Sequence, residues 1–125
     1  MTWANFTRAE FACRCGKCEN KIQDSFIDKL QDLREALGFP LRITSGYRCP
    51  AHNARVSGTG LSGPHTTGHA ADIAVSREQA FRLISMAAIS GFTGIGVSQK
   101  GASRFIHLDD LPAAAGQPRP TIWSY

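Results

Sequence analysis

The sequence contains no long hydrophobic run. No stretch approaches the roughly 18 consecutive apolar residues of a transmembrane helix, so we expect no membrane insertion. The first residues, Met-Thr-Trp-Ala-Asn-Phe, lack the basic segment followed by an apolar segment that marks a secretory signal. We therefore expect synthesis in the cytoplasm, so that any work outside the cell membrane needs another route of export.

Charged residues are also few, and none of them cluster. They make up 19% of the chain with a formal net charge of +4. No run of consecutive basic residues predicts a nucleic-acid-binding stripe, so we expect no nucleic-acid partner. A mildly basic surface is compatible with scattered, solvated Lys and Arg side chains, or with an anionic partner such as a cell wall.

The length of 125 residues predicts one domain, 1–125, large enough to bury a core. A Cys- and Gly-dense loop is expected at 11–21, and a proline-containing irregular tail at 111–125. The other elements are predicted from apolar periodicity, from capping boxes at Thr7–Glu10 and Ser76–Gln79, and from Pro50, which is typical of the first position of a helix. The expected helices are 24–37, 50–56 and 76–90, and the expected strands are 41–45, 70–75, 94–98 and 104–109.

Three residues of metal-binding type stand out: His65, Asp72 and His107. Strand alternation places Asp72 on a face where its neighbours carry only methyl groups, which leaves room beside its carboxylate. His107 lies on the face of its strand opposite to the core-facing residues. Two imidazoles and one carboxylate are a common ligand set for catalytic zinc, which keeps one coordination position for water. If the three side chains meet in space, the sequence predicts a hydrolase.

Three motifs resemble those of zinc D-Ala-D-Ala carboxypeptidases and related phage endolysin peptidases. Ser62-Gly-Pro-His65-Thr-Thr-Gly-His-Ala-Ala-Asp72 is similar to the Ser-x-His-x-x-Gly-x-Ala-x-Asp motif, with the serine one position farther from the histidine. Phe105-Ile-His107-Leu-Asp109 resembles the His-x-Asp element, and Ser45-Gly-Tyr-Arg48 the Ser-Gly-Tyr-Arg element. The resemblance implies the α+β fold that these peptidases share with hedgehog signalling domains, in which a small antiparallel sheet carries the zinc.

The resemblance also implies residue roles. His65, Asp72 and His107 would be the zinc ligands, and Arg48 would bind the substrate carbonyl or its developing oxyanion. A surface salt bridge is the alternative role for Arg48. Ser45 is expected to be structural, at the end of a strand.

One part of the family pattern is missing. Many members carry an acid or a histidine a few residues before the last ligand, but here that stretch is Gly101-Ala-Ser-Arg104-Phe. Asp109 shares a face with His107 and could either orient this histidine or act as the base. Asp110 is expected to point away, and His69 to be exposed. The other candidates for the base are Glu10, Glu19 and His52.

Four cysteines remain to be explained. Cys13, Cys15 and Cys18 form a C-x-C-x-x-C pattern, and Cys49 directly follows Arg48. They could hold a second, structural zinc ion, form two disulfides or remain reduced. In each case a link from the loop to Cys49 would brace the segment that presents Arg48.

The resulting hypothesis is a monomeric zinc peptidase of peptidoglycan stem peptides. Either D-Ala-D-Ala carboxypeptidase or L-Ala-D-Glu endopeptidase activity fits the motifs, in a phage or prophage enzyme that acts at the bacterial cell wall or periplasm. The first alternative is a catalytically inactive module that keeps zinc and binds the cell wall or a protein. The second alternative is a cysteine-zinc nucleic-acid binder.

Overall fold

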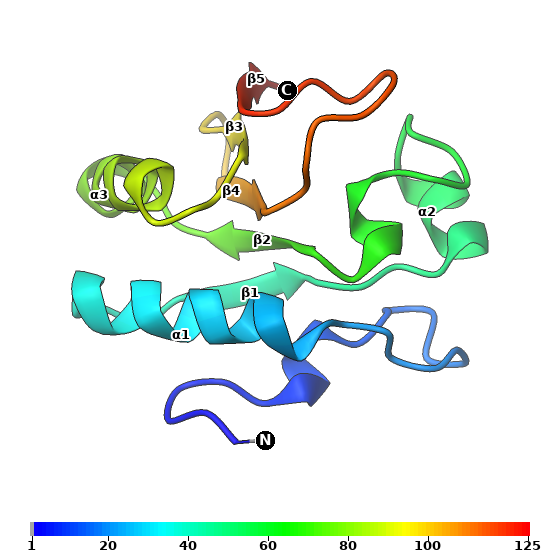
Figure 1. Ribbon diagram of the computed structural model, residues 1–125, viewed down its shortest axis with the longest axis horizontal. Helices are drawn as coiled ribbons and strands as arrows, with labels where there is room; N and C mark the ends of the chain where they lie inside the picture. The colour runs from blue at the N-terminus through cyan, green and yellow to red at the C-terminus, as the bar shows by residue number, and fades with distance from the viewer. Residues whose placement is uncertain (1) are drawn as a thin grey trace.

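The computed structural model describes residues 2–125 and shows an α+β domain with one five-stranded sheet, as the sequence predicts (Figure 1). The helical elements are η1 (Arg8–Phe11), α1 (Asp24–Leu37), α2 (Pro50–Val56), η2 (Pro64–Thr67) and α3 (Arg77–Ile89), η being a 3-10 helix. The strands are β1 (Arg42–Ser45), β2 (Ala70–Ala74), β3 (Gly94–Ser98), β4 (Phe105–Asp109) and β5 (Thr121–Ser124). The expected helices 24–37 and 50–56 have the predicted bounds.

The sheet is mixed, with the strand order β1-β2-β4-β3-β5. β1–β2, β2–β4 and β3–β4 are antiparallel pairs, whereas β5 joins the edge of β3 in parallel. The expected antiparallel sheet is formed by β1 to β4, and β5 extends it with a parallel pair. One expectation is corrected: the tail 111–125 is not irregular throughout. The prolines of the tail all precede residue 121, and the next residues include β-forming Thr, Ile and Trp, which the proline pattern concealed.

The hydrophobic core lies on the face of the sheet that α1 and α3 cover (Figure 1). Alternation within each strand divides the residues as predicted: Ile73 of β2 and Ile106 of β4 are fully buried in this core, while Asp72 and His107 face the other way. α1 ends at Gly38, whose left-handed φ of 77° closes the helix with a hydrogen bond from Gly38 N to Arg34 O.

The two predicted capping boxes have different outcomes. At η1 the box forms, since Thr7 N donates to Glu10 Oε2 at 2.7 Å. At α3 it does not form: Ser76 is the N-cap residue, but its side chain makes no capping hydrogen bond. Arg77 follows it with a left-handed φ of 52°, a conformation outside the regular first turn of a helix. Within residues 2–125, no helix is both long and apolar enough to cross a membrane.

Candidate metal centre

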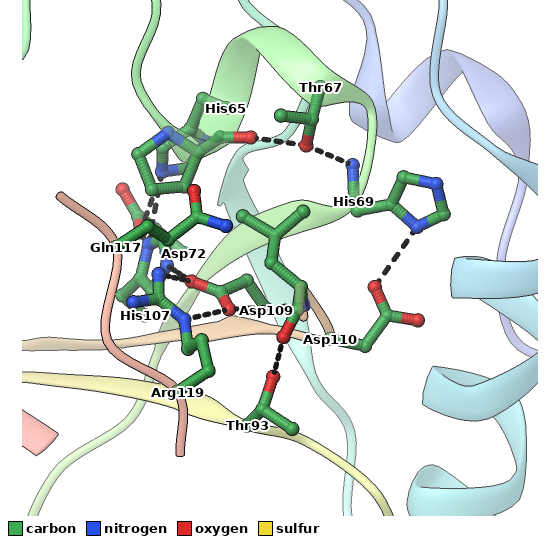
Figure 2. Close-up of polar contacts among 12 residues, drawn as sticks. His65, Thr67, His69, Asp72, Thr93, His107, Asp109, Asp110, Gln117 and Arg119 are labelled. Atoms are coloured by element: carbon green, nitrogen blue, oxygen red, sulfur yellow. Dashed lines mark hydrogen bonds and ion pairs between the residues drawn. The ribbon is translucent and has the colours of Figure 1, made fainter. Parts of the chain in front are cut away.

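The structure brings His65, Asp72 and His107 together, although 42 residues separate the first from the last (Figure 2). His65 Nε2, Asp72 Oδ1 and His107 Nδ1 form a triangle in which each side measures 3.2 Å. All three side chains are buried. The prediction that these residues converge is therefore confirmed.

Strand register explains why two of the ligands meet. Asp72 of β2 and His107 of β4 are directly opposite each other in an antiparallel pair, so their side chains leave the same face of the sheet side by side. His65 arrives from η2, just before β2. The chain turns between η2 and β2 at Gly68, whose φ is 79°; a Cβ there would lie 2.2 Å from Lys21 O, so glycine is required.

Outer hydrogen bonds fix the orientation of both imidazole rings. His65 Nδ1 lies 2.7 Å from Gly46 O, which can only accept, so Nδ1 carries the proton and Nε2 presents a lone pair. His107 Nε2 lies 2.8 Å from Asp109 Oδ2, a carboxylate oxygen, so Nε2 donates and Nδ1 presents a lone pair. These two lone pairs and a carboxylate oxygen of Asp72 point into one small space.

This arrangement fits a zinc ion. Bonds of about 2.0–2.1 Å to a tetrahedral zinc place neighbouring ligand atoms about 3.3 Å apart, close to the observed triangle. Three electron-rich atoms in buried contact need a positive charge between them. With three protein ligands, a tetrahedral ion retains a fourth position for water or substrate, as in catalytic rather than structural zinc sites.

The charge of the Asp72 carboxylate also favours binding of a cation at this site. Burial alone would raise the pKa of Asp72, but the neighbouring imidazoles of His107 and His65 outweigh burial and hold the pKa well below its usual range. The carboxylate is therefore charged at neutral pH. For His107, burial lowers the pKa, but the hydrogen bond with Asp109 and the negative charge of the neighbouring Asp72 outweigh it and raise the pKa overall. The raised pKa of His107 shows that negative charge surrounds its ring.

Asp109 lies behind His107, on the side of the ring away from the other two ligands. Its carboxylate accepts from His107 Nε2 and makes two hydrogen bonds with Arg119, from Nε at 2.9 Å and from Nη2 at 2.8 Å. Burial tends to raise the pKa of Asp109, but the hydrogen bonds from His107 and Arg119 outweigh it and lower the pKa. A fully buried, charged carboxylate in this position suits orientation of the metal ligand.

Two glycines of β3 make room for this arrangement. A Cβ on Gly94 would lie 2.3 Å from both carboxylate oxygens of Asp109. A Cβ on Gly96 would lie 2.7 Å from Trp123 Nε1 and 3.0 Å from His107 Cβ. Gly96 pairs with His107 on one side and with Trp123 on the other, so the Trp123 ring packs 5.0 Å from the His107 ring across the missing side chain.

Arg48 lies on the opposite side of the triangle, beside Asp72. Its Nε donates to Ser45 Oγ at 3.1 Å, Nη1 to Asn53 Oδ1 at 3.1 Å and Nη2 to Asp72 Oδ2 at 3.4 Å. Ser45 thus has the structural position expected of it. A guanidinium carries five N–H donors, so three bonds hold Arg48 in place and two donors remain for a ligand.

A cavity of about 490 Å³ opens over the metal-binding triangle. It holds no carboxylate or imidazole besides the three ligands, within the part of the chain that the structure describes. The remaining titratable side chains are Arg48 and Tyr125, and burial raises the pKa of the Tyr125 phenol. The lining residues are Arg48, Val56, Ser57, Gly58, Thr59, Pro64, His65, Asp72, Phe105, His107, Trp123 and Tyr125.

The other candidate bases lie elsewhere. Glu10 caps η1, and neither Glu19 nor His52 lines the cavity. His69 turns away from the metal-binding triangle and pairs with Asp110, with 3.0 Å between His69 Nδ1 and Asp110 Oδ1 (Figure 2). As expected, Asp110 points away from the ligands. His69, which was expected to be exposed, is instead half-buried, because its ring pairs with Asp110.

Sequence reasoning missed several residues of this site. Gly46 contacts His65 through its carbonyl, and the two glycines of β3 contribute the absence of a side chain, so residue type gives no signal of these contacts to the site. Arg119 and Trp123 come from the tail that was expected to be irregular. A charged residue between two prolines, Pro118-Arg119-Pro120, is the one local feature that could have drawn attention to Arg119.

The class of protein defined by this geometry is a metal-dependent hydrolase, with three ligands at the bottom of an open cavity. Comparison with protein-family models gives the family itself. The model described as Peptidase M15 matches residues 4–109, which include all three ligands and Arg48. The chain therefore belongs to the peptidase M15 family, and zinc is its metal. No curated protein matches the sequence.

Asp109→Asn is expected to weaken zinc binding by roughly 10–100-fold, because an amide is a poorer acceptor for the His107 N–H and loses the ion pair with Arg119. Competition with a chelating zinc indicator would measure the affinity. Unchanged zinc affinity together with lost hydrolysis would instead make Asp109 the catalytic base.

Gly94→Ala is expected to reduce the free energy of unfolding by about 1–3 kcal/mol, since the added methyl group forces the buried Asp109 carboxylate to move. Chemical denaturation would measure this change. Gly58→Ala is the matched control, because Gly58 has open space at the Cβ position. Equal stability of the two variants would contradict the close packing of Gly94 on Asp109.

Proposed function

We propose that this zinc peptidase hydrolyses the stem peptides of peptidoglycan. The observation that carries the proposal is the triangle of His65, Asp72 and His107 at the base of a cavity beside a fixed arginine, in a chain whose three motifs resemble those of D-Ala-D-Ala carboxypeptidases and endolysin peptidases. A net charge of +4 is also compatible with work on an anionic cell wall.

The residues around the cavity have separate roles in this reaction. His65, Asp72 and His107 hold the zinc ion, with their orientations set by Gly46 O, Arg48 and Asp109. When bound, zinc supplies a Lewis acid that activates water and polarises the scissile carbonyl. Arg48 directs its two remaining N–H donors to the carbonyl oxygen, where negative charge develops as the carbonyl is attacked. Phe105, Trp123 and Tyr125 provide an aromatic wall for the peptide.

The surroundings of the cavity favour an endopeptidase over a carboxypeptidase. A second cavity of about 510 Å³ adjoins the first and shares Thr59, Pro64 and Trp123 with it. Substrate residues can therefore extend beyond the metal site, and an endopeptidase needs such space on both sides of the scissile bond. Cleavage of an internal bond of the L-Ala-D-Glu type is the reaction that we propose, in wall lysis by a phage or prophage.

Digestion of purified muropeptides, followed by mass spectrometry of the products, tests this proposal. An endopeptidase cuts the stem internally, whereas a carboxypeptidase releases only the terminal D-Ala, which would overturn the choice of bond. A chelator should stop the reaction. Intact muropeptides after incubation with the zinc-loaded protein would contradict the proposed function.

One observation favours a second candidate, a module that binds the cell wall or a protein without catalysis. The cavity lining in the described residues has no carboxylate or imidazole beyond the metal ligands, so no side chain of the usual type is available as a general base. Sedimentation with insoluble peptidoglycan separates the two: binding without release of any peptide would support this candidate.

A further inference from the structure

The four cysteines form a compact cluster that includes Cys49, the residue after Arg48. Their Sγ atoms all lie within 4.8 Å of one another. The separations are 3.4 Å for Cys15–Cys18, 3.8 Å for Cys13–Cys49 and 3.8 Å for Cys15–Cys49. A disulfide joins its sulfurs at about 2.05 Å, so these are four neighbouring thiols.

These three sulfur separations are close to those around a shared metal ion. Zn–S bonds of about 2.3 Å in a tetrahedron place the sulfur atoms about 3.8 Å apart. Two disulfides would require closeness only within each pair, whereas one ion requires every sulfur to be close to the other three. The structure has the second pattern.

The local backbone supports metal-bound sulfur. Gly16, with a left-handed φ of 72°, makes the turn between Cys15 and Cys18 and donates its N–H to Cys13 O. Two amides lie against sulfur atoms: Lys17 N is 3.4 Å from Cys15 Sγ, and Cys49 N is 3.3 Å from Cys13 Sγ. Amide donors stabilise the negative charge of a thiolate, the form in which cysteine binds metal.

We propose that Cys13, Cys15, Cys18 and Cys49 bind a second zinc ion, and that this ion is structural. Four protein ligands close the tetrahedron, so no position remains for water or substrate. The sequence left three states open for these cysteines, and the sulfur geometry selects zinc among them.

The second ion would hold the cysteine-containing loop in place. Residues 12–23 form neither helix nor strand, so the loop has no ladder of backbone hydrogen bonds to hold it. The ion fixes this loop to Cys49, next to Arg48. In the same segment Gly46 packs on the backbone of Phe11, where a Cβ would lie 2.6 Å from Phe11 Cα, and its carbonyl orients His65. The cysteine site therefore supports both Arg48 and one ligand of the catalytic ion.

Elemental analysis of the purified full chain, prepared under reducing conditions with zinc and then dialysed, tests the proposal. Wild-type protein should contain two zinc ions per chain and the Cys18→Ala variant one, with a lower Tm. Cys18→His is the matched variant, because Cys3His is also a zinc ligand set; it should retain two ions and recover most of the Tm.

Cobalt loading of the His107→Ala variant provides an independent readout that does not depend on the cysteine variants folding. The expected result is thiolate-to-cobalt charge-transfer absorption with one cobalt per chain, since only the cysteine site remains intact. Absence of this absorption, equal zinc contents in the wild-type protein and Cys18→Ala, or a non-reduced mass lower by the hydrogens lost to a disulfide would each overturn the proposal. Because neither test measures hydrolysis, both remain valid if the proposed substrate is wrong.

Discussion

His107→Ala is expected to lower the zinc content by one ion per chain and to reduce hydrolysis of the proposed muropeptide substrate to background. The substitution removes one of three ligands and leaves the buried Asp109 carboxylate without the imidazole N–H that it accepts. Two remaining ligands hold zinc too weakly to survive dialysis, and the reaction loses its activated water. Elemental analysis and product masses measure the two effects on the same sample.

His69→Ala is the matched control. It also removes an imidazole, but the His69 ring pairs with Asp110 and is not one of the three metal ligands. This variant should keep its zinc and its activity. An unchanged zinc content in His107→Ala, or equal losses in the two histidine variants, would refute the ligand role of His107.

Arg48→Ala is expected to lower kcat by about 10²–10³-fold while the zinc content stays the same, because a donor to the developing oxyanion is lost. Only one of the three anchoring bonds of Arg48 goes to a metal ligand, and that contact is the longest, at 3.4 Å. The metal-binding triangle should therefore persist. Steady-state kinetics on a purified muropeptide, together with elemental analysis, would test this.

Arg104→Ala controls for the loss of a positive charge close to the site in sequence. Arg104 is three residues before His107 but does not line the cavity, and its Nε donates to Gly101 O. Its removal should change kcat little. If Arg48→Ala loses zinc as well as activity, Arg48 supports the Asp72 ligand rather than the oxyanion.

The metal ligands could be predicted because two simple regularities act together. Alternation along a strand puts Asp72 and His107 on faces away from the core residues Ile73 and Ile106, and few residue types bind metal ions. Periodicity located α1, which ends at Gly38, and Pro50 located the start of α2. These signals are contained within a few neighbouring residues.

The support behind the ligands could not be predicted, because it depends on pairing between distant segments. Gly94 and Gly96 matter through the side chains that they lack, and only the register of β3 with β4 and β5 shows which side chains occupy that space. Arg119 reaches Asp109 because β5 pairs in parallel with β3, and the local sequence of the tail does not show which strand it joins. The same holds for Gly46, which acts through a carbonyl that every residue possesses.

The central claim is that His65, Asp72 and His107 share one zinc ion that keeps a position open to the cavity. Anomalous diffraction at the zinc absorption edge, from crystals of the zinc-loaded protein, tests it most directly. The account predicts a peak about 2.0–2.2 Å from His65 Nε2, Asp72 Oδ1 and His107 Nδ1, with a water molecule or substrate as the fourth ligand. A map with no peak between these atoms, or with a fourth side chain bound to the ion, would contradict it.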